Sequence, residues 1–380
     1  MTGALRPGTS SNRNAGAHIG GLPVSPAGEA DTGPTLFLQR LNQYISLPLD
    51  VLICNPSLGN VSIAKRQPDR TLIARLDGTS YYDLTGRNLV GLLAQRKPGL
   101  RKPLRFLGMI RRYPAVARRW LNAYLDRGAL WLIRHADGIV FQSTLSRKMH
   151  EVFLGYAPGR VPETVIMNGV STEEFSPKAD APRLEGRPAV LISASVYRLH
   201  KRLQHAIELV NCLARDYPQI RLHVLGKFDP LVETLLPSLD TRRCDFHGRV
   251  PASMLSDYYR GADIQLSLSL FDPCPNVVCE GLASGLPVLT PAESGAAELV
   301  GDENDSWVVR EGIPLTYHEL QTAQAIPAVP VEKYIQCFEQ TLHTLPEQRD
   351  RARARAEQAL DIQRIAKLYD SFVAQIVQPS

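Results

Sequence analysis

The sequence predicts an α/β protein of two domains. Its length of 380 residues is enough for two full-sized hydrophobic cores. Short apolar runs that suit buried parallel strands recur along the chain, separated by helical patterns. A third observation is the stretch 271–301, which reads as a turn, a helix, a short strand and the start of a second helix.

The N-terminal half predicts a tail, helices and strands. Residues 1–32 are rich in Gly, Ser, Ala and Pro, so we expect a flexible tail and see no strong opening strand. A Gly-Pro turn then precedes a helix over 36–45. The strand signals lie at 51–55, 72–75, 136–143 and 165–170, and an interdomain linker is expected at about 171–187.

The C-terminal half predicts a second sheet with its own helices. A strand at 189–195 leads through a basic turn over 196–203 into a helix. Further strands are expected at 220–226, 244–248, 264–270 and 307–310, with a helix at 255–259. Two helices, 332–342 and 347–377, finish the chain.

The stretch 271–301 carries residues suited to binding an anion and hydroxyl groups. We expect one helix to begin at Asn276 as its N-cap and a second to begin at Ser294 and Gly295. Helix N-termini carry free N–H groups that favour an anion such as a diphosphate. Asp272 and Glu280 are eight residues apart, and two carboxylates at different depths could accept bonds from two sets of hydroxyls. The alternative is that both only cap local structure.

This stretch resembles the donor-site signature of the retaining GT-B glycosyltransferases of family 4, the glycosyl transferases group 1. That pattern is an acidic residue, seven residues and then Glu, and here it runs from Asp272 to Glu280, with Asp in place of the more usual first Glu. The resemblance implies two Rossmann-like domains facing a central cleft, with the last helix crossing back to the first domain. The implied division is a tail (1–32), an acceptor domain (33–175), a donor domain (176–345) and the closing helix (346–380).

The resemblance also assigns roles in donor binding. Glu280 would hold the ribose and Asp272 the transferred sugar. The backbone of Pro275, Asn276 and Val277, and that of Ser294 and Gly295, would face the diphosphate. A glycine-containing loop at the first helix would lean over the phosphates, which singles out Gly33 and Thr35, although an ordinary helix start explains them equally. Gly226 ends a strand near the expected nucleotide pocket, and Val250, which follows the strand at 244–248, is expected to flank the base.

Arg198 and Lys201 lie at a strand-to-helix turn, where two cations three residues apart can reach a pyrophosphate. The family places an Arg and a Lys at this turn to neutralise the leaving group. A solvated basic helix start is the alternative. Arg202 follows at a position that is often Gly in the family.

Asp77 follows the strand at 72–75, at the edge where α/β sheets bind ligands. Many family members have a His near the transferred sugar at the matching position. We therefore predict that Asp77 lines the acceptor–donor junction, as a base or as an acceptor for a sugar hydroxyl. A turn Asp that bonds its own backbone is the alternative.

Composition limits the classes of partner and cofactor. The net charge of +5 and the pI near 8.9 are too mild to indicate a nucleic-acid binder. The chain has no Asp-x-Asp and no CxxC pattern, so we expect neither a metal nor a cofactor besides the nucleotide-sugar co-substrate. Cys274 and Cys279 are interpreted as packing residues rather than nucleophiles.

A basic segment indicates where the protein could meet a membrane. Residues 96–119 hold nine Lys and Arg and no acid, interleaved with apolar residues. That pattern favours attachment to an anionic lipid surface, with a solvated helix face as the alternative. With no transmembrane run and no signal peptide in the sequence, we expect a cytoplasmic protein that this segment could attach to the inner face of the membrane.

The predicted function is that of a retaining hexosyltransferase that uses a nucleotide-diphosphate sugar. Its acceptor would be a glycan or a lipid-linked molecule in cell-surface polysaccharide or glycolipid biosynthesis. The implied mechanism needs no metal and uses front-face attack by the acceptor hydroxyl. A GT-B enzyme of another reaction type, such as a phosphorylase or an epimerase, and a non-catalytic GT-B module that binds a nucleotide or glycan are the alternatives.

Overall fold

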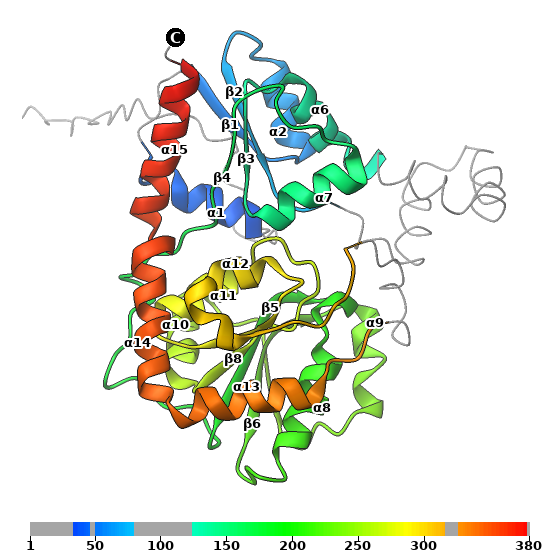
Figure 1. Cartoon of the computed structure of the whole chain (residues 1–380), viewed down its shortest axis with the longest axis vertical. Helices are drawn as coiled ribbons and strands as arrows, with labels where there is room; N and C mark the ends of the chain where they lie inside the picture. The colour runs from blue at the N-terminus through cyan, green and yellow to red at the C-terminus, as the bar shows by residue number, and fades with distance from the viewer. Residues whose placement is uncertain (1–32, 46–49, 80–123, 316–325, 378–380) are drawn as a thin grey trace, which may run out of the picture.

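A computed structural model of the chain describes residues 33–45, 50–79, 124–315 and 326–377. These residues form two lobes, one above the other, with a pair of helices along one side of both (Figure 1). The proposed tail (1–32) and the basic segment (96–119) lie outside the described residues. Of Gly33 and Thr35, the structure describes only their place in the first helix.

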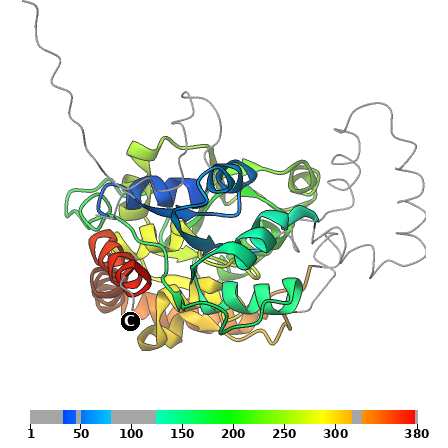
Figure 2. The same cartoon turned by 90° about the horizontal axis from the view of Figure 1, so that it is seen from above.

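The N-terminal lobe is built on a parallel sheet of four strands in the order β1-β2-β3-β4. The strands are β1 (Val51–Cys54), β2 (Thr71–Leu76), β3 (Gly138–Phe141) and β4 (Glu163–Val165). Helices α1 (Gly33–Leu41), α2 (Leu58–Lys65), α6 (Arg127–His135) and α7 (Thr144–Leu154) surround it, as the view from above shows (Figure 2). The predicted strand at 165–170 is wrong in its bounds, because β4 ends at Val165.

Both faces of this sheet are covered by helices, which explains its continuous apolar strands. Val51, Ile53 and Ile73 pack into a cluster with α1 and the C-terminal helix, whereas Leu52 and Leu72 pack on the other side with residues of α2 and α6. Side chains alternate between the two faces of a strand, so burial on both faces removes the polar positions.

The C-terminal lobe is built on a parallel sheet of six strands in the order β10-β9-β8-β5-β6-β7. The strands are β5 (Ala189–Tyr197), β6 (Arg221–Phe228), β7 (Cys244–Gly248), β8 (Ile264–Leu266), β9 (Val288–Pro291) and β10 (Val308–Val309). Its helices are α8 (Leu203–Leu213), α9 (Pro230–Glu233), α10 (Ala252–Gly261), α11 (Asn276–Ala283), α12 (Gly295–Val300) and α13 (Val331–His343). The strand predicted at 264–270 ends at Leu266, and its continuation is irregular.

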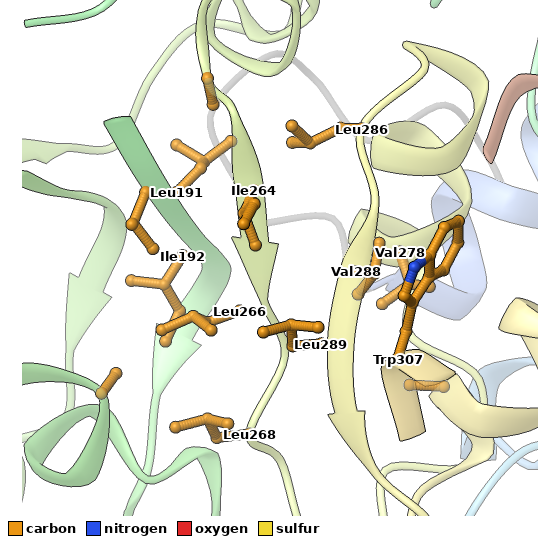
Figure 3. Close-up of a cluster of buried hydrophobic side chains, with 14 of the residues drawn as sticks. Leu191, Ile192, Ile264, Leu266, Leu268, Val278, Leu286, Val288, Leu289 and Trp307 are labelled. Atoms are coloured by element: carbon orange, nitrogen blue, oxygen red, sulfur yellow. The ribbon is translucent and has the colours of Figure 1, made fainter. Parts of the chain in front are cut away.

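The core of this lobe holds the stretch 271–301 in place. Figure 3 shows Leu191 and Ile192 of β5 beside Ile264 and Leu266 of β8, with Leu289 of β9 close by. These side chains are at most 3% exposed. A strand end fixed by such packing provides a rigid base for the polar residues that follow it.

The end of the chain crosses from one lobe to the other. Helix α14 (Leu345–Arg355) packs against α11, and α15 (Ile362–Val377) packs against α1. In the N-terminal lobe, the rings of Tyr369 and Phe37 lie 6.5 Å apart. The predicted crossing is confirmed, but the single helix predicted over 347–377 is wrong, because a π-helical turn (Ala356–Leu360) divides it.

Candidate active site

The candidate site lies where the two lobes face each other. The turn after β5 carries Arg198 and Lys201, and the irregular chain after β8 carries Asp272. Helix α11 follows with Glu280, while α1 and α7 of the N-terminal lobe lie opposite (Figure 1). The strands of a parallel sheet present their carboxyl ends at one edge, so these segments converge there.

Lys201 and Asp272 form an ion pair between two segments of the C-terminal lobe. The Lys201 ammonium donates a hydrogen bond to the Asp272 carboxylate. Their side chains are 22% and 13% exposed, so the pair is partly accessible to solvent. Arg198, three residues before Lys201, is exposed. The structure therefore brings together one cation and one carboxylate that the sequence had singled out separately.

Glu280 is a buried carboxylate with one partner from each lobe. The Arg40 guanidinium of α1 donates to Glu280 Oε1 at 3.3 Å, and the Tyr259 hydroxyl donates to Oε2 at 3.1 Å. The residue is only 6% exposed. Burial raises the pKa of Glu280, and the charge of Arg40 opposes that shift. The Glu280 carboxylate thus joins α1 of one lobe to α10 of the other rather than capping a nearby loop.

Asn276 does not cap α11, contrary to the sequence prediction. Pro275 is the N-cap residue, and Asn276 is the first residue of the helix. The Asn276 side chain instead accepts a hydrogen bond from the Asn168 amide at 2.7 Å, and the same amide donates to the Cys274 carbonyl at 2.9 Å. A polar group that bonds across the lobes is unavailable for capping, which accounts for the difference.

Ser294 is the N-cap residue of α12, and close packing requires Gly295 there. Ser294 Oγ accepts from the Ala296 N–H, and the Gly295 N–H donates to the Asp272 carbonyl at 2.7 Å. A Cβ on Gly295 would lie 1.7 Å from the Pro273 carbonyl oxygen. The segment before α11 and the start of α12 are therefore in direct contact.

Asp77 pairs with a buried arginine at the end of β2. The Arg75 side chain is fully buried and donates to the Asp77 carboxylate and to Asn168. Burial raises the pKa of Asp77, whereas Arg75 opposes the shift. A Cβ on the next residue, Gly78, would lie 2.7 Å from Pro273 Cγ. Asp77 is therefore a near neighbour of the chain beside Asp272.

Known proteins confirm the resemblance for the C-terminal half. Residues 176–318 match the family described as Glycosyl transferases group 1. Residues 176–318 therefore form a group 1 glycosyltransferase domain. No curated protein matches the chain.

Solved structures of glycosyltransferases share the fold of the whole chain. A sucrose-phosphate synthase from Thermosynechococcus elongatus aligns with a TM-score of 0.60 and 15% identity, over 91% of this chain and 80% of that one. HepE from Anabaena, in complex with UDP-glucose, aligns with a TM-score of 0.55 and 16% identity, over 90% and 82%. WaaG, a glycosyltransferase involved in lipopolysaccharide biosynthesis, aligns with a TM-score of 0.52 and 17% identity, over 84% and 80%. At these identities the likeness establishes the GT-B fold.

A further contact joins the glycosyltransferase domain to the N-terminal lobe. The Glu298 carboxylate of α12 accepts hydrogen bonds from the Thr144 and Leu145 N–H groups, at 2.7 and 2.8 Å. These are the first two residues of α7, where N–H groups lack partners within the helix. The two lobes are thus linked by Glu298 at the start of α7, by Arg40 at Glu280 and by Asn168 at Asn276.

The remaining predicted site residues of the glycosyltransferase domain lie in β6, after β7 and in α11. Gly226 is in β6 with φ +130, and a Cβ there would lie 1.8 Å from the Ala194 carbonyl oxygen. Val250 is half-buried and follows β7, and Val277 is half-buried in the first turn of α11. Cys274 is fully buried and its pKa is raised to about 12, in accord with packing rather than nucleophilic attack.

Sequence reasoning did not assign Arg40, Asn168, Arg75 or Tyr259 to this site. A weak signal existed for Arg75, because a charged residue inside the apolar run TLIARL needs a buried partner. Arg40 gave none, since it lies on an ordinary amphipathic helix, 240 positions from Glu280.

Two general features of the described residues complete the description. In the part of the chain that the structure describes, no three His, Cys, Asp or Glu residues are placed to hold a metal ion. Within the same part, no helix has both the length and the hydropathy needed to cross a bilayer.

Proposed function

We propose that the chain is a retaining glycosyltransferase that moves a hexose from a nucleotide-diphosphate sugar to a glycan or lipid-linked acceptor. The observation that carries this proposal is the ion pair between Lys201 and Asp272, 71 positions apart in the sequence. The Lys201 ammonium, a cation suited to binding a phosphate, lies beside the Asp272 carboxylate, which could accept a hydrogen bond from a sugar hydroxyl. The residues proposed as catalytic are Asp77, Arg198, Lys201 and Asp272.

Lys201 and Arg198 would stabilise the leaving group. When the bond between the sugar and the diphosphate breaks, negative charge builds on the phosphate oxygen. Fixed positive groups at that point lower the barrier, and removing one typically costs about 3 kcal/mol, or roughly a hundredfold in rate. In this mechanism, these two cations and the N-terminus of α11 take the place of a divalent metal ion.

Glu280 is proposed to bind the ribose of the donor. Its two oxygens now accept bonds from Arg40 and Tyr259, and ribose hydroxyls are donors of the same kind. A ribose could replace the Arg40 contact, because the 3.3 Å bond is long and the Arg40 side chain is 27% exposed. Asp77 is proposed to line the junction with the acceptor, since Gly78 packs against Pro273.

The division of labour between the lobes follows from these positions. We propose residues 33–175 as the acceptor domain and 176–345 as the donor domain, with 346–380 closing back on the first. UDP is the donor base to test first, because the fold neighbour HepE was solved with UDP-glucose. Lipopolysaccharide biosynthesis by WaaG supports a cell-surface glycan or glycolipid as the product class. We also propose that residues 96–119 attach the protein to the inner face of the membrane.

One observation favours a second candidate, a non-catalytic GT-B module. The first acidic residue of the signature is Asp272, which is shorter than Glu and already neutralised by Lys201. Such a module would bind a nucleotide or glycan without turnover.

A donor screen separates the enzyme from the binding module. Thermal shift with UDP-, GDP- and ADP-sugars identifies the donor, since ligand at a hundred times its dissociation constant adds about 2.7 kcal/mol of stability. Hydrolysis and transfer of that donor are then measured for the wild type, Lys201→Ala and Glu280→Ala, with exposed Lys367→Ala as control. We expect both site variants to fold and to lose transfer about a hundredfold or more. Near-normal turnover in either one contradicts the assignment, and binding without any turnover in the wild type favours the module.

A further inference from the structure

Two residues beside the proposed catalytic ion pair hold a left-handed backbone conformation that side chains rarely adopt. Arg202 has φ 55 and Phe271 has φ 54, and they are the non-glycine residues with positive φ among those described. Arg202 directly follows Lys201, and Phe271 directly precedes Asp272. Such conformations persist only where surrounding contacts hold them, and they are concentrated at functional sites.

The contacts that hold Arg202 come from the chain after β10. Its guanidinium forms two hydrogen bonds with the Glu311 carboxylate, at 2.6 and 2.7 Å, and the two side chains are 0% and 1% exposed. The hydroxyl of Tyr334 on α13 donates to the same carboxylate at 2.7 Å. A paired and hydrogen-bonded buried charge fixes geometry strongly, because leaving either partner alone is costly.

The contacts that hold Phe271 lead back to the same residue. The Phe271 N–H donates to the Glu293 carbonyl at 2.8 Å. The Glu293 carboxylate in turn accepts from the Glu311 N–H at 3.3 Å and from the Gly312 N–H at 2.7 Å. Glu311 is therefore joined to both strained residues, by its side chain to Arg202 and by its backbone, through Glu293, to Phe271.

We propose that Glu311 is a positioning residue, which sets the placement of Lys201 against Asp272 through Arg202 on one side and Glu293 on the other. The inference rests on the proposed function, since it gives the ion pair its purpose. Glycine at position 202 would accept the left-handed backbone without strain but could not tie the turn to the chain after β10. Arg202 thus supplies an anchor that glycine lacks.

The placement matters because the leaving-group charge develops at one point. A cation displaced by about 1 Å from that point can lower the rate about a hundredfold while leaving the bound substrate nearly unaffected. Loss of the Glu311 contacts should therefore lower kcat and leave the donor KM nearly unchanged. A merely structural role would lower the melting temperature and leave the kcat of the folded fraction unchanged.

The deciding experiment uses Glu311→Gln alone and combined with Arg202→Gly in the full chain. Wild type is first tested for hydrolysis of UDP-glucose, GDP-mannose and ADP-glucose, and the fastest donor is used throughout. Glu311→Gln leaves Arg202 buried without a counter-charge, so it should lose thermal stability as well as rate. The double variant removes that charge and the strain at position 202 together. We expect it to recover the melting temperature while kcat stays about 10- to 100-fold low and the donor KM changes less than about threefold.

Asp245→Asn is the control, because it breaks another arginine–carboxylate ion pair of this lobe, formed with Arg221 at the start of β6. It should keep the kcat of the wild type. If the double variant regains both stability and kcat, or if folded Glu311→Gln turns over normally, the positioning role is overturned. If wild type neither binds nor hydrolyses any of the three donors, the proposed function fails, and the positioning role falls with it.

Discussion

Glu280 is a buried acid whose charge depends on a residue from the other lobe. Burial raises its pKa above the ordinary value, and Arg40 holds that rise in check. The carboxylate therefore takes up a proton as the pH falls, at a higher pH than an exposed Glu would. The Arg40→Gln variant lacks the positive charge that opposes the effect of burial, so the pKa of Glu280 should rise further. We expect the acidic limb of nucleotide binding to move to higher pH, measured by calorimetry from pH 5 to 8.

Arg134→Gln provides the control for this prediction, because Arg134 is an exposed arginine near the end of α6. Its pH profile should match that of the wild type. An acidic limb that stays in place in Arg40→Gln would show that the charge of Glu280 does not govern binding.

At the scale of single residues, spacing revealed the pairs that are close in sequence. Asp272 and Glu280 were found from their separation in one stretch, and Arg198 and Lys201 from a shared turn. The partners Arg40 and Asn168 were not assigned, because they come from segments 240 and 108 positions away. A side chain's chemistry can be read locally, whereas its partner depends on how the lobes pack.

Helix α15 depends on a glycine in the strand beneath it. A Cβ on Gly138 would lie 2.2 Å from Ile376 Cδ1 and 3.2 Å from a ring carbon of Phe372. Gly138→Val should therefore overpack this contact and lower the free energy of unfolding by about 2 kcal/mol. Chemical denaturation measures the loss. In a double-mutant cycle, Ile376→Ala should recover part of it, because it removes the atoms that clash.

Gly59→Ala is the matched substitution on α2, where a Cβ meets no atom within 4 Å. Alanine favours the helix, so this variant should be stabilised by about 0.5 to 1 kcal/mol. Equal effects of the two substitutions would contradict the packing explanation.

At the scale of elements, the sequence predicted most helices and strands but not how some of them end. Residues 347–377 contain no Gly or Pro that would end a helix, yet the helix breaks near Asp361. There Asp361 accepts from the N–H groups of Gln363 and Arg364, and its other oxygen accepts from the Thr172 hydroxyl at 2.6 Å. The contact with Thr172, which lies in the linker between the lobes, thus overrides the local preference for a continuous helix. Tertiary contacts of this kind cannot be read from periodicity.

At the scale of the whole molecule, the arrangement of the lobes came from resemblance and not from physical patterns. Two apolar cores were predictable from length and strand signals. The return of α15 to the first lobe had no local signal, because an amphipathic helix shows that it packs but not on what. Polar contacts between the lobes join residues far apart in the sequence, and apolar side chains such as Met149 pack with the core of the C-terminal lobe.

Glu298 gives the clearest test of this coupling between the lobes. Its carboxylate accepts from the first two N–H groups of α7, and it stands on the helix that begins with the proposed diphosphate-facing Gly295. A carboxylate at a helix N-terminus satisfies free donors and opposes the positive end of the helix dipole. In Glu298→Gln the charge is lost, so we expect unfolding to become easier by about 1 kcal/mol.

Hydrogen exchange locates that effect within the molecule. If Glu298 holds the lobes together, the amides of Thr144 and Leu145 should exchange faster in Glu298→Gln, because the charged acceptor of their hydrogen bonds is lost. The core strands β5 and β8 should keep their protection, since their hydrogen bonds do not involve the interface. Glu339→Gln, an exposed substitution on α13, should change neither region. Unchanged exchange at Thr144 and Leu145 in Glu298→Gln would mean that the lobes are oriented by the Arg40 and Asn168 contacts instead.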